Sequence, residues 1–459
     1  MTPSYAMFLA FASLLILAYC NDCYVSAATC HPDDESGLLA FKSGITEDPL
    51  GLLSNWKPGT DCCFWSGIDC IDNRRRVRFI SLYGQPDNPK GYLSGTISPL
   101  LSKVRNLRSI QFIDLRNMTG SFPRFVYNLP NLIFFSIENS KLSGPLPADF
   151  GPLSNLYSLN LKGNRFSGSI PDGLRKLKEL TALHLGENRF SGEIPNFWDS
   201  FPKLVYLQLQ HNKLSGGIPT SIASLAPNFQ NLELNNNQLS GKIPEFISNF
   251  KGLHTLDLSS NMFTGVLPKN FKNLTGLRNL KLARNKLVDP FPALAIDRIV
   301  SLDLSYNKFK LGKIPEWVVS SDAVESLKLA GCGIKMRLDD LKPSWTYYIK
   351  FNIDLSDNEI SGSAVNLANG IEDLEGFWMS GNRLKFNLSD FKMRESLKYL
   401  DLSRNQVFGS VPESIVGLEK LNLSYNRLCG KIPASKFPAS AFKGNACLCG
   451  SPLPACRRL

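Results

Sequence analysis

The sequence repeats itself at a period close to 24 residues, and no other feature limits its possible folds as strongly. Prolines mark the period, at Pro123, Pro147, Pro171, Pro195, Pro219, Pro244, Pro268, Pro292 and Pro315. Neighbouring members of this series are 23 to 25 residues apart, and one clean copy is NLYSLNLKGNRFSGSIPDGLRKLK. A repeat this short cannot bury its apolar side chains alone. We therefore expect a stack of similar coils in place of separate globular domains.

Each copy follows the pattern LxxLxLxxNxFSGxIPxxLxxLx, whose first half is the leucine-rich repeat pattern with a parallel strand at LxL. The Asn is expected to point inward and to bond backbone groups that the tight turn leaves unpaired. This position is held by Asn164, Asn188, Asn212, Asn237, Asn261, Asn285, Asn307, Asn358, Asn382, Asn405 and Asn426. Cys332 occupies the same position and is predicted to be a buried structural thiol. We count about 15 repeats over residues 77–428.

The tail of the pattern, SGxIP, lies outside the minimal leucine-rich signature and recurs as SGSIP, SGEIP, SGGIP and SGKIP. In this the chain resembles the plant-specific class of extracellular leucine-rich repeats. The resemblance implies a second short strand beside the main sheet and a twisted, right-handed superhelix. The predicted fold class is an α/β leucine-rich-repeat solenoid with a parallel β-sheet on its concave face and a disulfide-bonded cap at each end.

Cysteines cluster at the two ends of the repeat array. Residues 29–76 carry Cys30, then an amphipathic segment, and then Cys62, Cys63 and Cys70. Cys62 and Cys63 are adjacent and are not expected to bond each other, which leaves Cys30 with one of them and Cys70 with the other. Residues 429–459 form the second cysteine-containing segment, with Cys429, Cys447, Cys449 and Cys456. For the four cysteines of the first segment, disulfides are favoured over a metal site.

The order of motifs toward the C-terminus narrows the resemblance. NEISGSAVNLANG, NRLKFNLSDF, NQVFGSVPESIVGL, LNLSYNRLCGKIP and CLCGSPLPAC follow one another, while CHPDDESGLLAFK and DCCFWSGIDC stand near the start. This succession resembles plant polygalacturonase-inhibiting proteins, although this chain has about four or five more repeats. The resemblance implies the pairs Cys30–Cys62, Cys63–Cys70, Cys429–Cys447 and Cys449–Cys456.

The first residues predict secretion. An apolar run from Ala6 to Cys20 is followed by small residues, which is typical of a secretory leader over residues 1–28. No later segment is long and apolar enough to span a bilayer, and no hydrophobic tail for a lipid anchor follows the last cysteine. We expect a secreted protein of the extracellular space or plant cell wall, where disulfides persist. The formal net charge of +11 suits either attraction to an anionic matrix or ordinary solubility.

Ligand-binding candidates are the side chains that alternate outward beside the core leucines of each LxL strand. They are Lys162, His184, Tyr206, Gln208, Gln210, Glu233, Asn235, Asp257, Lys281, Asp303, Lys328, Asp354, Trp378, Tyr399 and Asp401. Acidic residues recur at the middle position, which suits a basic partner or simply keeps the strand soluble. Trp378 and Tyr399 lie one repeat apart on the same face, where exposed aromatics are typical interface anchors. The sequence leaves a binding role and a structural role open for Trp378.

The sequence contains no motif that is typical of catalysis or of cofactor binding. GxSxG, HExxH and phosphate-loop patterns are absent, and His184 and His211 lack a third metal ligand. We therefore expect no enzyme activity, no cofactor and no metal. Glycosylation sequons begin at Asn117, Asn273, Asn387 and Asn422; Asn273 lies on a predicted convex turn and is the best candidate.

The leading hypothesis is a secreted, non-enzymatic recognition protein that binds a protein or peptide on its concave face in cell-wall defence or signalling. Its specific form, implied by the resemblance, is inhibition of a microbial polygalacturonase. One alternative is a co-receptor or ligand-binding component of a membrane receptor-kinase complex. Another is a structural wall protein associated with pectin. No nucleic-acid partner and no membrane span are expected.

Overall fold

The computed structural model describes residues 30–70, 75–225, 228–294, 296, 298–343 and 351–456. The predicted leader over residues 1–28 lies outside these described residues. The chain divides into two compact units, unit 1 up to Leu142 and unit 2 from Ser143 onward, and each is described by itself.

Unit 1 begins with the helix α2 (Pro32–Ser43), which His31 caps by accepting a hydrogen bond from the Asp33 amide. Acidic residues in its first turn favour the positive end of the helix dipole. Leu38 and Phe41 are fully buried, and the Phe41 ring stacks on Phe112 of the repeats at 5.1 Å. The predicted amphipathic segment is therefore a helix whose apolar side closes over the first coils.

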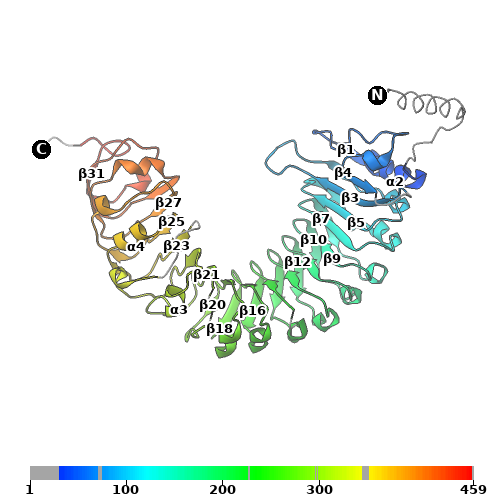
Figure 1. Ribbon diagram of the computed structural model, residues 1–459. Helices are drawn as coiled ribbons and strands as arrows, with labels where there is room; N and C mark the ends of the chain where they lie inside the picture. The colour runs from blue at the N-terminus through cyan, green and yellow to red at the C-terminus, as the bar shows by residue number, and fades with distance from the viewer. Residues whose placement is uncertain are drawn as a thin grey trace, which may run out of the picture. The chain divides into compact units, whose positions relative to one another are not determined.

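Unit 1 contains the first strands of both layers (Figure 1). In the main sheet, β2 (Ile68–Cys70) is antiparallel to β3 (Val77–Tyr83), which is followed in parallel by β5 (Ser109–Ile113) and β7 (Phe134–Glu138). In the second layer, β1 (Ile45–Glu47) is antiparallel to β4 (Ser94–Thr96), and β6 (Asn117–Gly120) is parallel to β4. The cap thus pairs with the first repeat by antiparallel strands, whereas the repeats pair with one another in parallel.

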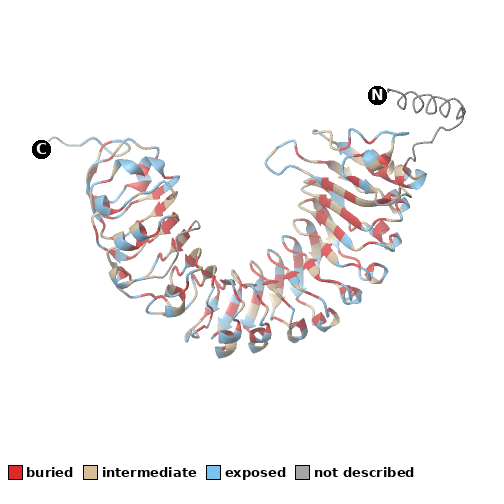
Figure 2. Ribbon diagram, viewed as in Figure 1, coloured by how far each residue is buried: buried red, intermediate tan, exposed pale blue. Residues whose placement is uncertain are grey.

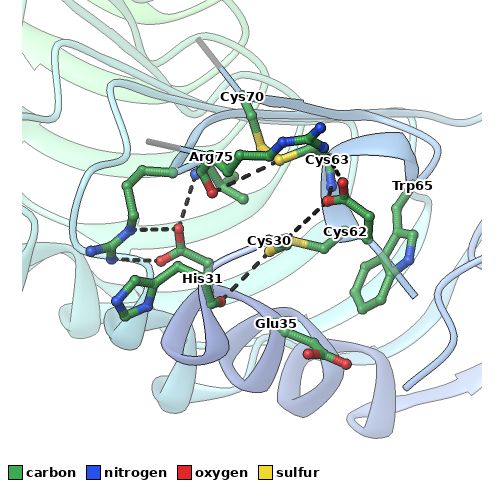
Figure 3. Close-up of a disulfide and its surroundings, with 12 residues drawn as sticks. Cys30, His31, Glu35, Cys62, Cys63, Trp65, Cys70 and Arg75 are labelled. Carbon is green, nitrogen blue, oxygen red and sulfur yellow. Dashed lines mark hydrogen bonds and ion pairs between the residues drawn. A yellow bond between two sulfur atoms is a disulfide. The ribbon is translucent and has the colours of Figure 1, made fainter. Parts of the chain in front are cut away.

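The N-terminal cap is held by two disulfides and by an ion pair to a buried aspartate (Figure 3). Cys30 is bonded to Cys62 and Cys63 to Cys70, which are the pairs that the family resemblance implies. Asp34 is fully buried and accepts bonds from Arg76 Nε at 2.9 Å and Nη2 at 2.8 Å. The hydrogen bond to Asp34 raises the pKa of Arg76.

In unit 2 the main sheet consists of short parallel strands. They are β9 (Ser158–Asn160), β11 (Ala182–His184), β13 (Tyr206–Gln208), β15 (Asn231–Glu233), β17 (Thr255–Asp257), β19 (Asn279–Lys281), β21 (Ser301–Asp303), β22 (Ser326–Lys328), β23 (Phe351–Asp354), β25 (Leu374–Trp378), β27 (Tyr399–Asp401) and β29 (Lys420–Asn422). Each strand places its central apolar residue opposite that of the next, as Leu183 lies opposite Leu207 and Leu207 opposite Leu232. These apolar side chains belong to the core, and buried residues recur in every coil (Figure 2).

The second layer of unit 2 consists of β8 (Lys141–Pro145), β10 (Arg165–Gly168), β12 (Arg189–Glu193), β14 (Lys213–Gly216), β16 (Gln238–Lys242), β18 (Met262–Gly265) and β20 (Lys286–Leu287). Further along, β24 (Ser361–Gly362) pairs with β26 (Arg383–Leu384), and β28 (Phe408–Gly409) with β30 (Arg427–Lys431) and β31 (Cys447–Cys449). Short helical turns cross between the layers, among them the α-helices α3 (Glu316–Val319) and α4 (Val365–Gly370). The predicted second strand is therefore present.

The Ser-Gly dipeptide of the repeat explains where the second layer forms. Its glycine has a positive φ in coil after coil, 82° at Gly168, 82° at Gly192 and 85° at Gly241, a conformation that glycine adopts without strain. After β20 the sequence reads VDPFP and the dipeptide is missing. There, isolated bridges such as Val288 to Lys308 replace strands within the described residues, until Ser361–Gly362 restores the layer.

The Asn ladder has the predicted inward geometry. Asn188 Nδ2 donates to the carbonyls of Leu161 in the preceding coil at 2.9 Å and Leu185 in its own coil at 3.2 Å. Its Oδ1 accepts the Phe166 amide at 3.0 Å. Cys332 takes the same position: it is buried and free, and burial is the main cause that raises the pKa of its thiol to about 12. Its identity as a buried structural thiol is confirmed.

The C-terminal cap imitates one more repeat. Cys429 is bonded to Cys447, its register partner on β31, and Cys449 to Cys456, again the pairs that the resemblance implies. Asn445 donates to the Leu423 carbonyl at 3.0 Å and accepts the Leu428 amide at 3.0 Å, as the ladder asparagines do. The sequence pattern did not reveal this last member. The predicted fold class, parallel sheets of leucine-rich coils with disulfides near both ends, is confirmed.

Candidate ligand-binding face

The candidate residues of unit 2 lie in rows across the main sheet because neighbouring strands pair without a shift over most of it. Tyr206 is opposite Asn231, and Gln208 is opposite Glu233, in the ladder between β13 and β15. The first strand position gives one row and the next outward position a middle row. The residue after that gives a third row. We call the surface formed by these rows the main-sheet face.

The recurring aspartates of the middle row have a structural role. Asp257, Asp303 and Asp354 each accept the backbone amide two residues later through Oδ1, at 3.0 Å in every case. Asp401 does the same at 2.9 Å, and Asn160 at 3.1 Å. Such Asx turns end the strand and start the tight turn. From the sequence, the recurring aspartates suggested either a basic partner or a role in solubility. Their hydrogen bonds to the turn amides are a third explanation for their recurrence.

Lysines interrupt the acidic row. In register across consecutive strands the middle row reads Asp257, Lys281, Asp303, Lys328 and Asp354. Lys281 Nζ lies 3.9 Å from Asp257 Oδ2. Burial is the main cause that raises the pKa of Asp257 and of Asp354, and hydrogen bonds from Ser259 and Ser356 oppose it. This part of the face alternates in sign, so it lacks the acidic stripe that the aspartates alone suggested.

A hydrogen-bonded chain of larger polar side chains crosses β11, β13 and β15. His184 Nδ1 lies 2.5 Å from Gln208 Oε1, and Gln208 Nε2 donates to Glu233 Oε1 at 3.0 Å. Asn231 Nδ2 donates to the same Glu233 oxygen at 3.1 Å. None of these contacts closes a turn, since they join side chains only. This region is therefore a stronger candidate for binding than the aspartate positions.

Two predicted binding residues that lie next to these hydrogen-bonded side chains are buried, not exposed. Gln210 is 6% and Asn235 8% exposed, and Asp257 in the next coil is also 8% exposed. The Gln210 amide lies over Gly186, where a Cβ atom would come within 2.5 Å of Gln210 Oε1. Simple alternation along a strand predicted solvent exposure, and that prediction is wrong here because side chains of adjacent coils cover one another.

The aromatic pair lies at the other end of unit 2. The Trp378 and Tyr399 rings stack with centroids 6.0 Å apart and planes 15° apart. The two side chains belong to different rows. They meet because the Trp378 ring lies over Gly376, and Gly376 is the register partner of Tyr399. Tyr399 Oη donates to Glu419 at 2.9 Å, which is the main cause that raises the Tyr399 pKa, and Lys420 Nζ lies 5.8 Å from the ring. Both rings are half-buried in this packing.

Among the other candidates, Tyr206 is 41% exposed and Lys328 is exposed. Lys162 is half-buried and pairs with Glu187 at 3.2 Å. The described residues hold no group of His, Cys, Asp and Glu side chains that could bind a metal ion. No helix in the described part of the chain has the length and apolarity needed to cross a membrane.

The sequons differ in how their asparagines are engaged. Asn117 accepts a bond from Lys141 at 2.5 Å, and Asn387 caps a helical turn by accepting the Ser389 amide. Asn422, on β29, accepts from Ser424 and donates to Asp401. Asn273 is exposed at the end of the turn Lys269–Asn273.

A basic column went unnoticed in the sequence. The residue after the ladder Asn is exposed and basic in several coils: Arg165, Arg189, Lys213, Lys286 and Lys308. The first four of these begin the second-layer strands β10, β12, β14 and β20. The recurring NR and NK dipeptides could have revealed the column, because the period places them on one side of the stack.

Comparison with known proteins agrees with this architecture. The family described as leucine rich repeat N-terminal domain matches residues 31–71. Leucine rich repeat families match residues 154–214, 227–287, 396–418 and 417–435.

Polygalacturonase inhibitor 2 from Arabidopsis thaliana is 39% identical over 113 residues, which are 23% of this chain and 34% of that protein. The DNA damage-repair/toleration protein DRT100 from the same plant is 36% identical over 140 residues, 29% of this chain and 37% of that protein. The chain therefore matches 34% to 37% of the length of these relatives.

Among solved structures, the plant peptide hormone receptor RGFR1 in complex with RGF2 aligns with a TM-score of 0.57 and 28% identity. That alignment covers 74% of this chain and 62% of the receptor chain. The matched families show a leucine rich repeat N-terminal domain and leucine rich repeats in this chain, and over part of its length the chain is similar to a plant polygalacturonase inhibitor.

Proposed function

We propose that this chain is a secreted, non-enzymatic recognition protein whose main-sheet face in unit 2 binds a protein or peptide. The observation that carries the proposal is the pair of side-chain clusters on that face, one polar around His184, Gln208 and Glu233 and one aromatic at Trp378 and Tyr399. Both consist of large side chains that close no turn of the fold. Aromatic side chains are among the usual anchors of protein interfaces.

The relatives indicate which kind of partner and which biological role to propose. Polygalacturonase inhibitors are named for blocking an enzyme, and the aligned receptor was solved with a peptide hormone. By analogy we infer a role in cell-wall defence or signalling in the extracellular space, with a microbial polygalacturonase or a plant receptor kinase as the partner. The disulfides at both ends suit an oxidising compartment.

Affinity capture from plant extracellular fluid tests the proposal. The full chain is compared with a Trp378→Ala, Tyr399→Ala double variant and with a Val416→Ala control, whose side chain is 56% exposed on a turn away from the sheet. We expect at least one protein or peptide that the wild type and the control retain and the double variant loses. Recovery of the same material by all three proteins would reject the aromatic cluster as an anchor. A panel of polygalacturonases then distinguishes inhibition from other recognition.

A second candidate function is association with pectin, and the basic column supports it. Arg165, Arg189 and Lys213 are exposed and occupy successive coils, which suits a linear polyanion. On immobilised polygalacturonate the wild type should elute at higher salt than an Arg165→Gln, Arg189→Gln, Lys213→Gln variant. Equal elution of the two proteins would reject this candidate.

A further inference from the structure

The ladder position of the coil that contains β22 is held by Cys332 in place of asparagine. In the coil before it, the Asn307 side chain accepts the Leu287 amide of the preceding coil at 3.1 Å through Oδ1. A cysteine has no amide oxygen with which to accept such a bond. Its thiol is only a weak donor, and Cys332 Sγ lies 3.4 Å from the Leu304 carbonyl. The ladder between the coils of β21 and β22 is therefore weaker than its neighbours.

The cysteine leaves one backbone amide of the preceding coil without its usual acceptor. By the repeat, Phe309 corresponds to Leu287, since each stands two residues after a ladder Asn. Phe309 is 3% exposed, and its amide donates to no residue that the structure describes. A buried amide without an acceptor destabilises the contact in which it lies.

The second layer is also reduced around this coil. Between β20 and β24 the described residues of that layer are joined by isolated bridges in place of paired strands. These bridges are Val288 to Lys308, Gly312 to Ile334 and Arg337 to Ser361. The main sheet is continuous, because β22 pairs with both β21 and β23. The contact between the coils of β21 and β22 thus depends mainly on the main sheet.

A row of side chains on the turns beside the main sheet crosses this contact. We call the row the strap: Arg284, Tyr306, Asp357 and Arg404. The Arg284 guanidinium lies 4.9 Å from the centre of the Tyr306 ring. Tyr306 Oη donates to Asp357 Oδ2 at 3.3 Å, and Arg404 Nη2 donates to Asp357 Oδ1 at 2.8 Å. Since Tyr306 follows β21 and Asp357 follows β23, the strap passes over the whole coil of β22.

Two glycines leave room for the strap. Gly331 and Gly381 hold the same turn position as the strap residues, with φ of 61° and 65°. A Cβ atom at Gly331 would lie 3.2 Å from Tyr306 Cδ1, and one at Gly381 would lie 2.5 Å from Asp357 Oδ1. The strap therefore adds side-chain contacts between coils at the place where the ladder and the second layer are both reduced.

We propose that the contact between the coils of β21 and β22 is a joint, at which unit 2 divides into two stretches that open separately, and that the strap keeps the joint closed. In a stack of coils each interface contributes its own free energy, so opening begins at the weakest interface. The joint lies between the polar cluster on β11 to β15 and the aromatic pair on β25 and β27. A partner that contacts both clusters would hold the joint closed, and this consequence alone rests on the proposed function.

Hydrogen exchange of the full chain in low concentrations of urea, measured by mass spectrometry, tests the joint. In the wild type we expect the amides of β22 to β29 to exchange in a different step from those of β9 to β21. Cys332→Asn supplies the missing acceptor and should slow the faster step about tenfold. Cys332→Ala also removes the thiol but adds no acceptor, so it should not slow that step. A single common step in the wild type, or equal rates in the two folded variants, would overturn the joint.

Two tyrosine variants test the strap. Tyr306→Phe removes the hydroxyl that reaches Asp357 and keeps the ring beside Arg284, and it should speed the faster step about threefold. Tyr425→Phe is the matched control, because Tyr425 holds the same turn position, is 52% exposed and has no hydroxyl bond to a described residue. Thermal unfolding confirms that all variants are folded. Equal exchange in the two tyrosine variants would show that the strap does not keep the joint closed.

The outcome of this experiment is independent of the proposed function, since no ligand is present. A negative result overturns the joint and leaves the proposed binding face standing. Failure of the affinity capture would reject the aromatic anchor and leave the joint standing.

Discussion

The polar residues of this protein fall into two classes. Residues of the first class bond backbone groups and stabilise the coil, whereas residues of the second class contact other side chains and stabilise no turn. The ladder asparagines belong to the first class, since each joins two adjacent coils through its side-chain amide. The middle-row aspartates also belong to it, although they face outward, because they accept the amides that begin the turn. His184, Gln208 and Glu233 belong to the second class.

Replacing a ladder asparagine should therefore be costly. Asn261 donates to Leu234 at 2.9 Å and accepts the Leu239 amide at 3.0 Å. Asn261→Ala leaves these buried backbone groups unpaired and should lower the free energy of unfolding by about 2–4 kcal/mol. The measurement is chemical denaturation followed by circular dichroism. Asn279→Ala is the control, as this half-buried asparagine only bonds the Thr255 hydroxyl, and an equal loss in both variants would contradict the ladder's role.

The charge of Asp257 should be dispensable. Burial raises its pKa, so the folded state favours the protonated form, and the stability cost of the charge grows as pH rises through the folded pKa above 3.8. Asp257→Asn keeps the acceptor for Ser259, as Asn160 shows in another coil, and removes the charge. We expect a denaturation midpoint at pH 7 equal to or above that of wild type, with no difference at pH 3. A variant clearly less stable at pH 7 would show that the pair with Lys281 outweighs burial.

At the scale of elements, each of the second-layer strands β10, β12, β14, β16 and β18 contains one glycine with a positive φ. The sequence predicted these strands by resemblance, and the backbone supplies the cause: the Ser-Gly glycine has a left-handed φ in coil after coil. In coils that lack the dipeptide the second layer is reduced to the two-residue strands β20 and β26 and to isolated bridges such as Val288 to Lys308, within the described residues. The repeat signature is thus a conformational requirement that recurs at the same place in each coil.

A matched pair of glycines isolates that requirement. Gly241 has φ of 85° and open space where an added Cβ atom would lie, and Gly417 has the same open space without a positive φ. Gly241→Ala should destabilise by about 1–2 kcal/mol through the backbone alone. Gly417→Ala should be neutral or slightly stabilising, because it restricts the unfolded chain. Denaturation midpoints compare the two, and equal effects would contradict the conformational explanation.

For unit 2 as a whole, stability should be transmitted only from neighbour to neighbour. Each coil contacts the coils beside it, and the C-terminal cap covers the last one with Phe442, which is fully buried. In such an array, loss of an end cap frays the adjacent coils first.

Hydrogen exchange measured by mass spectrometry tests this expectation. Phe442→Ala should speed exchange in β29 and β30 while leaving β11 to β15 unchanged, since large-to-small substitution in a core costs about 3–5 kcal/mol locally. Lys443→Ala is the control, because that side chain is exposed and only approaches the Tyr425 ring. Faster exchange throughout the unit in Phe442→Ala would mean that it unfolds as one cooperative body.

The sequence by itself determined the coil. The period, the leucine positions and the Asn position are local, repeated at a fixed spacing, and each fixes the same strand and turn whatever lies in the next coil. The cysteine segments are also local patterns, and they indicated two capped ends. Even Cys332 could be assigned, because it occupies a position that ten or so other coils define.

Only the tertiary structure decided what the main-sheet face presents. The burial of Gln210 over Gly186 and the stacking of Trp378 on Tyr399 both arise between coils. Side chains of that length reach across the narrow spacing between parallel strands, which is about 4.8 Å. Their exposure therefore depends on the size of the residue one repeat away, a relation that alternation along a single strand does not contain.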